Sequence, residues 1–311
     1  MLVSEELYVK ENIAGFYQMN TLTQNITNIY EKKGKDWISN LPNIIAILAK
    51  HWNLRDVTPV DNMTFNYVAK AILGDSQPVI LKISCDLKTI LDEMKALIQF
   101  DGNGSVKLID SNDKYNALLI QQAVPGITLK KLYPENVEYV MDCYVDTMKK
   151  LHKMHLPNKH EYRYIADWLV ALDKLTPDQI PAHMLKRAID LRDTLLSSMG
   201  QPAFLHGDLH HDNILKHNDS WLAIDPKGIV GEPEFEIAAF DFMYITELAN
   251  TIDVKQIFEK RVAMLAQKSN FDARRIKDWV FVRLILMAAW LIEDSGDPSW
   301  AIKLAQILIL I

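Results

Sequence analysis

The sequence predicts an α+β fold with two lobes, a small strand-rich N-terminal lobe of residues 1–122 and a larger, mainly helical C-terminal lobe of residues 123–311. The 311 residues are enough for two hydrophobic cores. Short apolar runs bounded by turn residues dominate the first part, whereas apolar residues at helical spacing dominate the second. The pattern changes at Pro125-Gly126 without a repeat or a flexible linker, so we expect a short hinge there.

The N-terminal lobe is expected to combine a helical N-terminal segment with an antiparallel sheet. Residues 42–52 have apolar side chains at helical spacing, and Asn40 is the expected N-cap. The turn signal Gly74-Asp75-Ser76 separates two strand-like runs. We predict strands at 65–68, 79–83, 106–109 and 117–121 and a helix at 87–100, whose apolar face is Ile90, Leu91, Met94, Leu97 and Ile98.

The C-terminal lobe is expected to be mainly helical. We predict helices at 133–155, 165–174, 184–198, 236–250, 254–267 and 273–292. Two strand-like pieces, 203–205 and 221–225, interrupt this pattern. Residues 307–311 form a bare apolar run, which we expect to pack against the body of the lobe.

The charge and the apolar pattern argue against two kinds of partner. The net charge is -6 and no basic stripe is visible, so we expect no nucleic-acid partner. The N-terminus lacks the features of a signal peptide, and the apolar stretch 279–292 is too short to span a bilayer and contains Arg283. We therefore expect no membrane partner. Cys85 and Cys143 match neither a zinc motif nor a disulfide framework, which indicates two reduced thiols and a cytoplasmic location.

The segment most indicative of chemistry is a polar loop, residues 206–213, followed by an apolar piece that ends at Asp225. Loops held on rigid supports often carry reactive side chains. Phosphoryl transfer needs a carboxylate that orients the attacking hydroxyl and accepts its proton, and oxygen ligands that hold Mg²⁺ on the phosphates. Asp208, Asn213 and Asp225 supply these groups. They predict ATP and Mg²⁺ as cofactors.

From His206 to Asn213 this loop resembles the kinase catalytic loop, H-x-D-x-x-x-x-N. Gly207 and His210 make it more similar to the aminoglycoside phosphotransferases than to the protein kinases. The stretches that resemble the streptomycin kinase and hydroxyurea-resistance kinase branch are 25–52, 223–233 and 288–294. The resemblance covers most of the chain. It implies a bilobal protein-kinase-like fold, a role in antibiotic resistance, and an ATP- and Mg²⁺-dependent phosphotransferase acting on an alcohol group of an aminoglycoside such as streptomycin.

By this resemblance Asp208 is the catalytic base, and Asn213 and Asp225 are the Mg²⁺ ligands. Asp225 corresponds to the aspartate of the protein-kinase Asp-Phe-Gly motif. Because Pro226-Lys227-Gly228 follows it, the phenylalanine switch of protein kinases is absent. Lys227 either stabilises phosphate charge or is a solvated loop lysine.

The nucleotide-binding residues are expected in the N-terminal lobe. Residues 79–82 resemble the kinase strand whose lysine meets the α- and β-phosphates, which assigns that role to Lys82. Glu93 lies eleven residues later on a predicted helix and is the expected partner of Lys82, with Asp92 as a competitor.

The phosphate-covering hairpin is expected at residues 61–68, which contain no glycine. Because backbone N–H groups approach phosphates most closely when side chains are small, Thr64 and Asn66 would donate side-chain hydrogen bonds there instead. The resemblance places the adenine-binding hinge at Gln121 to Ala123, where backbone groups make the contacts.

Carboxylates are the expected ligands of a cationic substrate, because they form charge-assisted hydrogen bonds. Glu293 and Asp294 are favoured since they end an apolar helix that should pack near the catalytic loop, and Glu232 is also expected to face the cleft. Glu236 stands where the branch usually has an aspartate, and its longer side chain leaves its structural role open.

The sequence is also compatible with three other interpretations, and it leaves the oligomeric state open. The enzyme could phosphorylate another hydroxylated metabolite. The glycine-free loop is the best argument for a catalytically silent nucleotide-binding protein. The third alternative is a metal-hydrolase site built from His206, His210, His211 and Asp212, although no distant His/Asp motif completes it.

Overall fold

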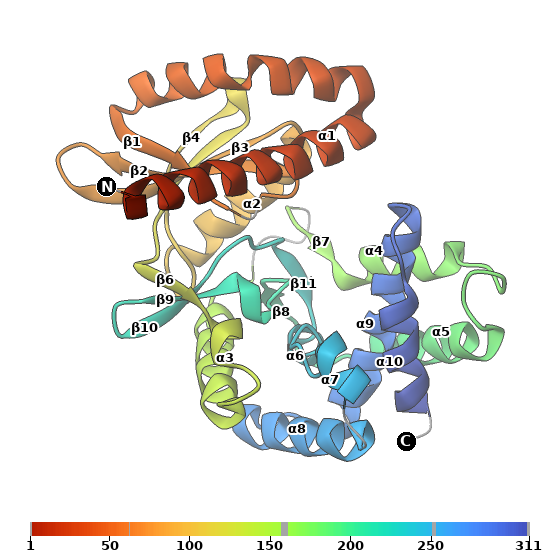
Figure 1. Ribbon diagram of the computed structural model, residues 1–311. Helices are drawn as coiled ribbons and strands as arrows, with labels where there is room; N and C mark the ends of the chain where they lie inside the picture. The colour runs from red at the N-terminus through yellow and green to blue at the C-terminus, as the bar shows by residue number, and fades with distance from the viewer. Residues whose placement is uncertain (1, 62, 157–160, 251–252, 310–311) are drawn as a thin grey trace. The chain divides into compact units, whose positions relative to one another are not determined.

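The computed structural model describes residues 2–61, 63–156, 161–250 and 253–309 (Figure 1). The chain divides into two compact units. Unit 1 comprises Met1–Gly102 and Val106–Ala123, and unit 2 comprises Asn103–Ser105 and Val124–Ile311. The short segment 103–105 belongs to unit 2 because the Gly104 carbonyl accepts a hydrogen bond from the Ala223 N–H at 2.8 Å.

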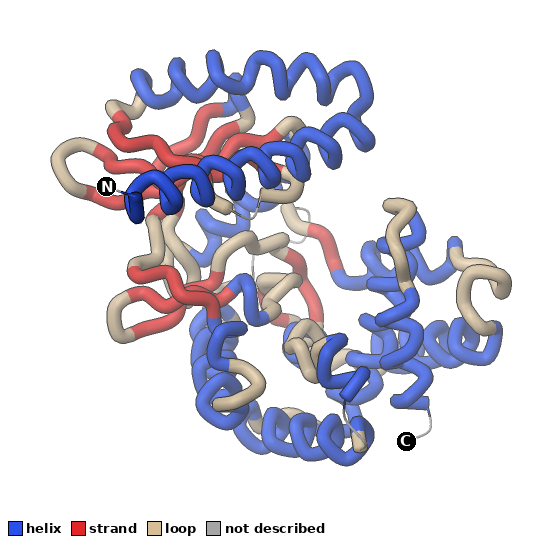
Figure 2. The backbone as a smooth tube through the Cα atoms, in the orientation of Figure 1, coloured by secondary structure: helices blue, strands red, loops and turns tan. Residues whose placement is uncertain are grey.

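Unit 1 is built on a five-stranded antiparallel sheet (Figure 2). In spatial order the strands are β1 Leu54–Pro59, β2 Asn66–Leu73, β3 Gln77–Ser84, β5 Ala117–Gln121 and β4 Leu108–Asn112. β3 lies in the middle, and all four residues of its second half are buried, which explains the apolar run that predicts it. β1 is not apparent in the sequence because it has no run of buried apolar residues. Within this strand only Leu54 is buried.

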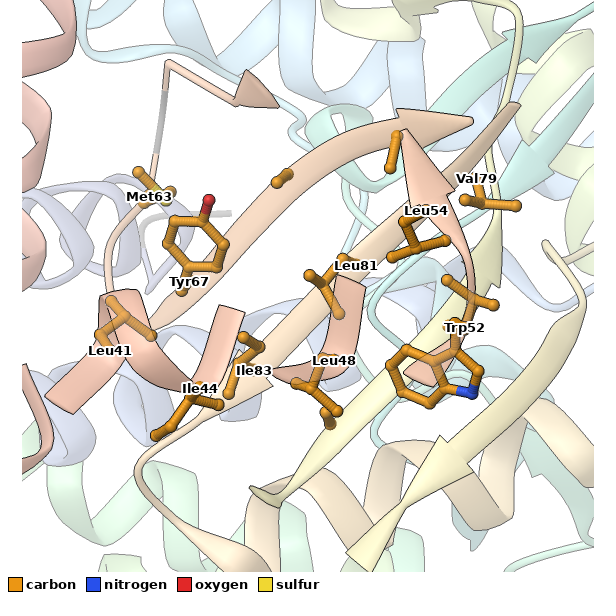
Figure 3. Packing of buried hydrophobic residues seen from close by; sticks show 14 of the residues in the cluster. Leu41, Ile44, Leu48, Trp52, Leu54, Met63, Tyr67, Val79, Leu81 and Ile83 are labelled. Atoms are coloured by element: carbon orange, nitrogen blue, oxygen red, sulfur yellow. The ribbon is translucent and has the colours of Figure 1, made fainter. Parts of the chain in front are cut away.

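Helix α1, Leu2–His51, lies against this sheet and is kinked at Glu31, where φ is 46°. Figure 3 shows Leu41, Ile44 and Leu48 of α1 pointing toward apolar side chains of the strands, including Leu81. The expected N-cap at Asn40 is wrong, since the helix continues through this position. Burial of one helical face against the sheet outweighs the local start signal.

Helix α2, Leu87–Phe100, has the predicted bounds. Asp86 caps its N-terminus by accepting a hydrogen bond from the Thr89 N–H at 2.8 Å. Its buried face is rotated relative to the predicted one, because Ile98 is 58% exposed whereas Glu93 is buried. The helix thus carries a carboxylate into the core of unit 1.

Unit 2 is mainly helical, as predicted. Its α-helices are α3 Val137–Leu151, α4 Ile165–Leu169, α5 Ala182–Ser197, α6 Pro233–Ile237, α7 Ile245–Asn250, α8 Val254–Ser269, α9 Ala273–Glu293 and α10 Ser299–Ile309, with short 3₁₀ turns η2 Leu129–Leu132, η3 Val170–Lys174 and η4 His211–Asn213. α9 packs against α5, α6, α8 and α10. The single helix predicted at 236–250 is wrong, since α6 and α7 are separated by a segment that buries Phe240 and Phe242.

The last predicted element, the apolar run 307–311, is partly described. Leu308 is buried in α10, as expected for packing against the body of the unit, and residues 310–311 lie outside the described residues. Among the described residues, no helix combines the length and the apolar character needed to cross a membrane.

Two small sheets hold the polar segment that the sequence singles out. One has the order β10-β9-β6, and the other has the order β7-β11-β8. Their strands are β6 Pro125–Thr128, β7 Arg163–Tyr164, β8 Ala203–Leu205, β9 Ile214–His217, β10 Ser220–Ala223 and β11 Ile229–Gly231. The chain therefore enters the loop from β8, forms the β9–β10 hairpin and leaves along β11, which pairs with β8.

Candidate active site

His206 supports the loop from within. Its Nε2–H donates to the carbonyl of Ile224 at 2.8 Å, and its Nδ1 accepts the N–H of Asp208 at 3.2 Å. Burial lowers the pKa of His206, in agreement with a neutral ring that donates through one nitrogen and accepts through the other. The ring therefore fixes the backbone at Asp208 against the segment that leads to Asp225.

Glu236 anchors the same loop from α6. Its side chain is fully buried, and its two oxygens accept the backbone N–H groups of His206 at 2.6 Å and of Gly207 at 2.9 Å. Burial opposes its negative charge, yet the hydrogen bond from His152 and the loop N–H groups hold the pKa of Glu236 below its ordinary value. This answers the structural question that the sequence left open, because the longer side chain reaches two successive loop amides.

Asp208 lies at the end of this support with one third of its side chain exposed. Its Oδ1 accepts a hydrogen bond from Nη2 of Arg283 at 3.1 Å. Its Oδ2 is 3.8 Å from Nε2 of His210. Burial opposes ionisation, but the charge of Arg283 holds the pKa of Asp208 below its ordinary value. The group is therefore a carboxylate at neutral pH.

Asn213 and Asp225 are brought together by the β9–β10 hairpin. Ala223 pairs with Ile214, and one step further the Ile224 N–H donates to the Asn213 carbonyl at 2.9 Å. Both side chains thus come from the open end of the hairpin. Asp225 has φ of 58°, a left-handed conformation that aspartate tolerates better than most residues.

These two residues fit a magnesium site by their donor chemistry. Nδ2 of Asn213 donates to the backbone carbonyl of Asp208 at 2.9 Å, which leaves Oδ1 as the atom for a cation. An amide oxygen and a carboxylate are ligands that Mg²⁺ accepts while keeping several waters. Asp208, Asn213 and Asp225 therefore lie in one short structural motif of unit 2.

Lys82 and Glu93 form the predicted ion pair within unit 1. Nζ of Lys82 lies 2.6 Å from Oε2 of Glu93, and the two side chains are only 5% and 6% exposed. Lys82 comes from the central strand β3 and Glu93 from the buried face of α2. A buried ammonium group that moved away from its carboxylate would be an uncompensated charge. The pairing with Glu93 therefore keeps the ammonium group of Lys82 in a defined place.

The other predicted nucleotide residues occupy the edges of unit 1. The side chain of Thr64 is exposed, and its carbonyl accepts a hydrogen bond from Nδ2 of Asn25 at 3.1 Å. Asn66 begins β2, and Asn62 in the same predicted loop lies outside the described residues. Their approach to phosphate remains a prediction.

The residues of the predicted hinge differ in whether their backbone N–H groups are hydrogen-bonded. The backbone N–H of Gln121 donates to the carbonyl of Lys107 at 2.8 Å, and its Oε1 accepts from the Lys107 N–H at 3.2 Å. The N–H of Gln122 donates to the Pro78 carbonyl at 3.4 Å. Ala123, by contrast, has no backbone hydrogen bond to any described residue.

The predicted substrate carboxylates are not gathered at Asp208. Glu232 is buried and accepts hydrogen bonds from Nε of Arg275 at 2.7 Å and from Nε1 of Trp279 at 2.5 Å, so its surroundings give it a structural role in place of the expected substrate contact. Glu293 and Asp294 are exposed at the end of α9. They lie almost three helical turns beyond Arg283, about 15 Å along the axis.

The residues of the metal-hydrolase alternative have separate partners. His206 is held by Ile224, and Nδ1 of His211 lies 2.9 Å from the hydroxyl of Tyr244. Burial lowers the pKa of His211 to about 3, and its ring packs against Phe240. Asp212 pairs with Lys130. Within the described part of the chain, no three His, Cys, Asp or Glu side chains converge on a possible metal position.

Comparison with known proteins decides the family. A family model described as "Aminoglycoside/hydroxyurea antibiotic resistance kinase" matches residues 51–295. The chain belongs to this kinase family. Streptomycin 6-kinase of Streptomyces griseus is 24% identical over 305 residues, which cover 95% of this chain and 94% of the relative. Hydroxyurea phosphotransferase of Kitasatospora aureofaciens is 23% identical, with 89% of this chain and 81% of the relative covered.

The kinase has the same fold as a solved structure of another phosphotransferase. The aminoglycoside phosphotransferase APH(4)-Ia, in a ternary complex with ADP and hygromycin B, superposes with a TM-score of 0.62 at 12% identity, covering 85% of this chain and 97% of that one. The α+β, protein-kinase-like fold predicted from the catalytic loop is therefore confirmed. The kinase is a phosphotransferase.

Sequence reasoning missed one residue of the kinase's catalytic loop support. Arg283 contacts both Gly207 and Asp208 from α9. The signal for it in the sequence is a charged residue inside the apolar stretch 279–292. A buried charge needs a partner, and here the partner is the candidate base.

Proposed function

We propose that this kinase transfers the γ-phosphoryl group of ATP to a hydroxyl of an aminoglycoside such as streptomycin, with Asp208 as the base. The observation that carries the proposal is the state of Asp208. Its carboxylate is ionised, partly exposed and held by a buried loop, while Oδ2 has no hydrogen-bond partner among the residues described. A base must reach the proton that it removes, and this oxygen is free to do so.

Residues of unit 1 and residues of unit 2 have different proposed roles. Lys82, held by Glu93, would contact the phosphates, and Asn213 with Asp225 would hold Mg²⁺. Bound Mg²⁺ would neutralise charge on the phosphates during transfer. Thr64 and Asn66 are proposed to donate to the phosphates, and the backbone of Ala123 and Gln121 is proposed to flank the adenine. Because the transition state is stabilised by position and charge, these residues need no covalent step.

The aminoglycoside assignment draws on the similarity to streptomycin 6-kinase over nearly the whole chain. Glu293 and Asp294 are the exposed carboxylates proposed to attract a cationic acceptor, whereas Glu232 is not retained in this role because both its oxygens hold protein donors. The second acceptor class is a small hydroxylated compound such as hydroxyurea, which the family description and the Kitasatospora relative favour.

The test compares wild type with Asp208→Asn in an ADP-release screen over streptomycin, other aminoglycosides and hydroxyurea. We expect streptomycin-dependent ADP release in wild type, and a loss of 10²- to 10⁴-fold in Asp208→Asn, roughly the contribution of a general base. Asp219→Asn, an exposed aspartate in the β9–β10 turn, is the matched control and should retain full activity.

The outcomes separate the alternatives. Release only with hydroxyurea would move the assignment to the second acceptor class. ADP release in no mixture, with Mg·ATP binding intact, would favour a silent nucleotide-binding protein. If Asp208→Asn kept more than half of the wild-type rate, Asp208 would not be the base.

A further inference from the structure

Arg283 is a buried cation within an apolar helix. Its side chain is 5% exposed, and its neighbours Val282 and Leu284 in α9 are buried. Removing a guanidinium from water costs several kcal/mol unless hydrogen bonds and an opposite charge compensate. The groups that contact Arg283 must therefore compensate its charge.

Among the described residues, the hydrogen bonds and the ring contact of Arg283 lead to the catalytic loop or its support. Nη1 donates to the Gly207 carbonyl at 3.1 Å, and Nη2 donates to Oδ1 of Asp208 at 3.1 Å. The guanidinium carbon lies 5.3 Å from the ring centroid of Phe235. A planar fork that binds a carbonyl and a carboxylate of successive residues fixes their relative orientation, which a flexible ammonium group cannot do.

This orientation makes the two oxygens of Asp208 unequal. Oδ1 is occupied by Arg283, whereas Oδ2 has no hydrogen-bond partner among the described residues and lies 3.8 Å from Nε2 of His210. The free oxygen therefore lies on the side of His210. A carboxylate that could rotate freely would present either oxygen.

We propose that Arg283 is a positioning residue that reserves Oδ2 of Asp208 for the acceptor hydroxyl, so that the hydroxyl approaches from the side of His210. This inference rests on the proposed function. In the step, the hydroxyl oxygen forms a bond to the γ-phosphorus as the bond to the β,γ-bridging oxygen breaks. The hydroxyl proton passes to Oδ2, and ADP leaves with the electron pair of the broken bond.

The experiment uses the full chain and a double-mutant cycle. The variants are Arg283→Gln, Arg283→Lys, Asp208→Asn and the double variant Asp208→Asn/Arg283→Gln. Arg274→Gln, an exposed arginine of the same helix, is the matched control. The measurements are kcat and KM for ATP and for streptomycin, together with the thermal unfolding midpoint of each protein.

The changes in kcat and KM that we expect differ from those of a variant that has simply lost its fold. Arg283→Gln should lower kcat about 10²-fold, as expected for a misplaced catalytic group, with KM for ATP within about twofold of wild type. Arg283→Lys should recover part of kcat, because it keeps the charge but not the fork. In the Asp208→Asn background the same Arg283→Gln change should cost less than about twofold, since residues that act as a unit are not additive.

Two results would overturn the inference. One is a kcat above half of wild type in Arg283→Gln, and the other is a full additional loss in the double variant. If Arg283→Gln does not fold, Arg283→Lys carries the comparison.

The inference and the proposed function fail in different ways. If wild type phosphorylates neither streptomycin nor hydroxyurea, the proposed function is wrong. The unfolding midpoints of the four proteins of the cycle, which are wild type, Arg283→Gln, Asp208→Asn and the double variant, then decide whether Arg283 holds Asp208. Strictly additive changes would contradict the inference, whereas a double variant no less stable than Arg283→Gln alone would support it.

Discussion

Glu236 is buried beneath the catalytic loop and accepts two of its backbone N–H groups. A carboxylate in this position compensates two donors that are shielded from water. Its charge is in turn supported by His152, whose Nε2 lies 3.4 Å from Oε2. At the scale of single residues, the loop is therefore held by Glu236 at His206 and Gly207, and by Arg283 at Gly207 and Asp208.

Replacing Glu236 by alanine should destabilise the protein. Two buried N–H groups would lose their acceptor, and each orphaned group costs about 1–3 kcal/mol. We expect the free energy of unfolding to fall by at least about 2 kcal/mol in urea titrations. Glu234→Ala, two residues away in α6, is the control and should cost less. Equal stability of the two variants would show that the loop does not depend on Glu236.

At the scale of elements, α2 determines where Glu93 lies. Its start is set by Asp86, whose carboxylate accepts hydrogen bonds from both the N–H and the hydroxyl of Thr89. Its periodicity then turns Glu93, not Ile98, toward the core. In unit 2 the hairpin of β9 and β10 likewise determines where site residues lie. Its pairing brings Asn213 beside Ile224, the residue that precedes Asp225.

Asp86→Ala should lower the free energy of unfolding by about 1 kcal/mol, the usual value of an N-cap. Burial opposes the charge of Asp86, but the hydrogen bonds from Thr89 hold its pKa below the ordinary value. A carboxylate with a lowered folded-state pKa stabilises the protein above its unfolded pKa of about 3.9, and this contribution is lost as the pH falls through the lower folded value.

The difference between wild type and Asp86→Ala should therefore shrink in acid. Asp86→Asn is the matched control, because asparagine caps helices well but does not titrate. Urea unfolding of the three proteins between neutral and acidic pH provides the measurement. A wild-type advantage over Asp86→Ala that grows in acid would contradict the assigned role of the carboxylate.

At the scale of the whole molecule, the proposed machinery is divided between the two units. Lys82 with Glu93 belongs to unit 1, and Asp208, Asn213 and Asp225 belong to unit 2. Changing a residue in either set tests the role proposed for that set in binding Mg·nucleotide. Ligand binding to the folded state raises stability by an amount that depends on the ratio of ligand concentration to Kd.

Mg·ADP should raise the thermal unfolding midpoint of wild type, and Lys82→Met and Asp225→Asn should each reduce this rise. A tenfold weaker Kd removes about 1.4 kcal/mol of ligand stabilisation at saturating ligand. Removing Mg²⁺ with EDTA should diminish the rise in wild type and change Asp225→Asn little, because that variant lacks one of the two proposed metal ligands. Lys70→Met, an exposed lysine on the neighbouring strand β2, is the control for Lys82→Met. An unchanged rise in Lys82→Met would remove Lys82 from the nucleotide site.

The sequence by itself determined the features that depend on neighbouring residues. The spacing from His206 to Asn213, the position of Asp225 and the bounds of α2 follow from local patterns of polar and apolar residues, so they could be predicted. The change from strands to helices near residue 125 likewise reflects periodicity within each part. These local patterns also carried the resemblance that predicted the kinase family.

Only the tertiary structure decided which distant side chains meet. Arg283 reaches Asp208, Glu236 reaches the loop amides, and Glu232 is enclosed by Arg275 and Trp279. Each contact joins residues separated by tens of positions, and helical periodicity does not identify the partner of a buried charge. Burial imposes that partner, because an ionised group removed from water is tolerated only where another element supplies the opposite charge or hydrogen bonds.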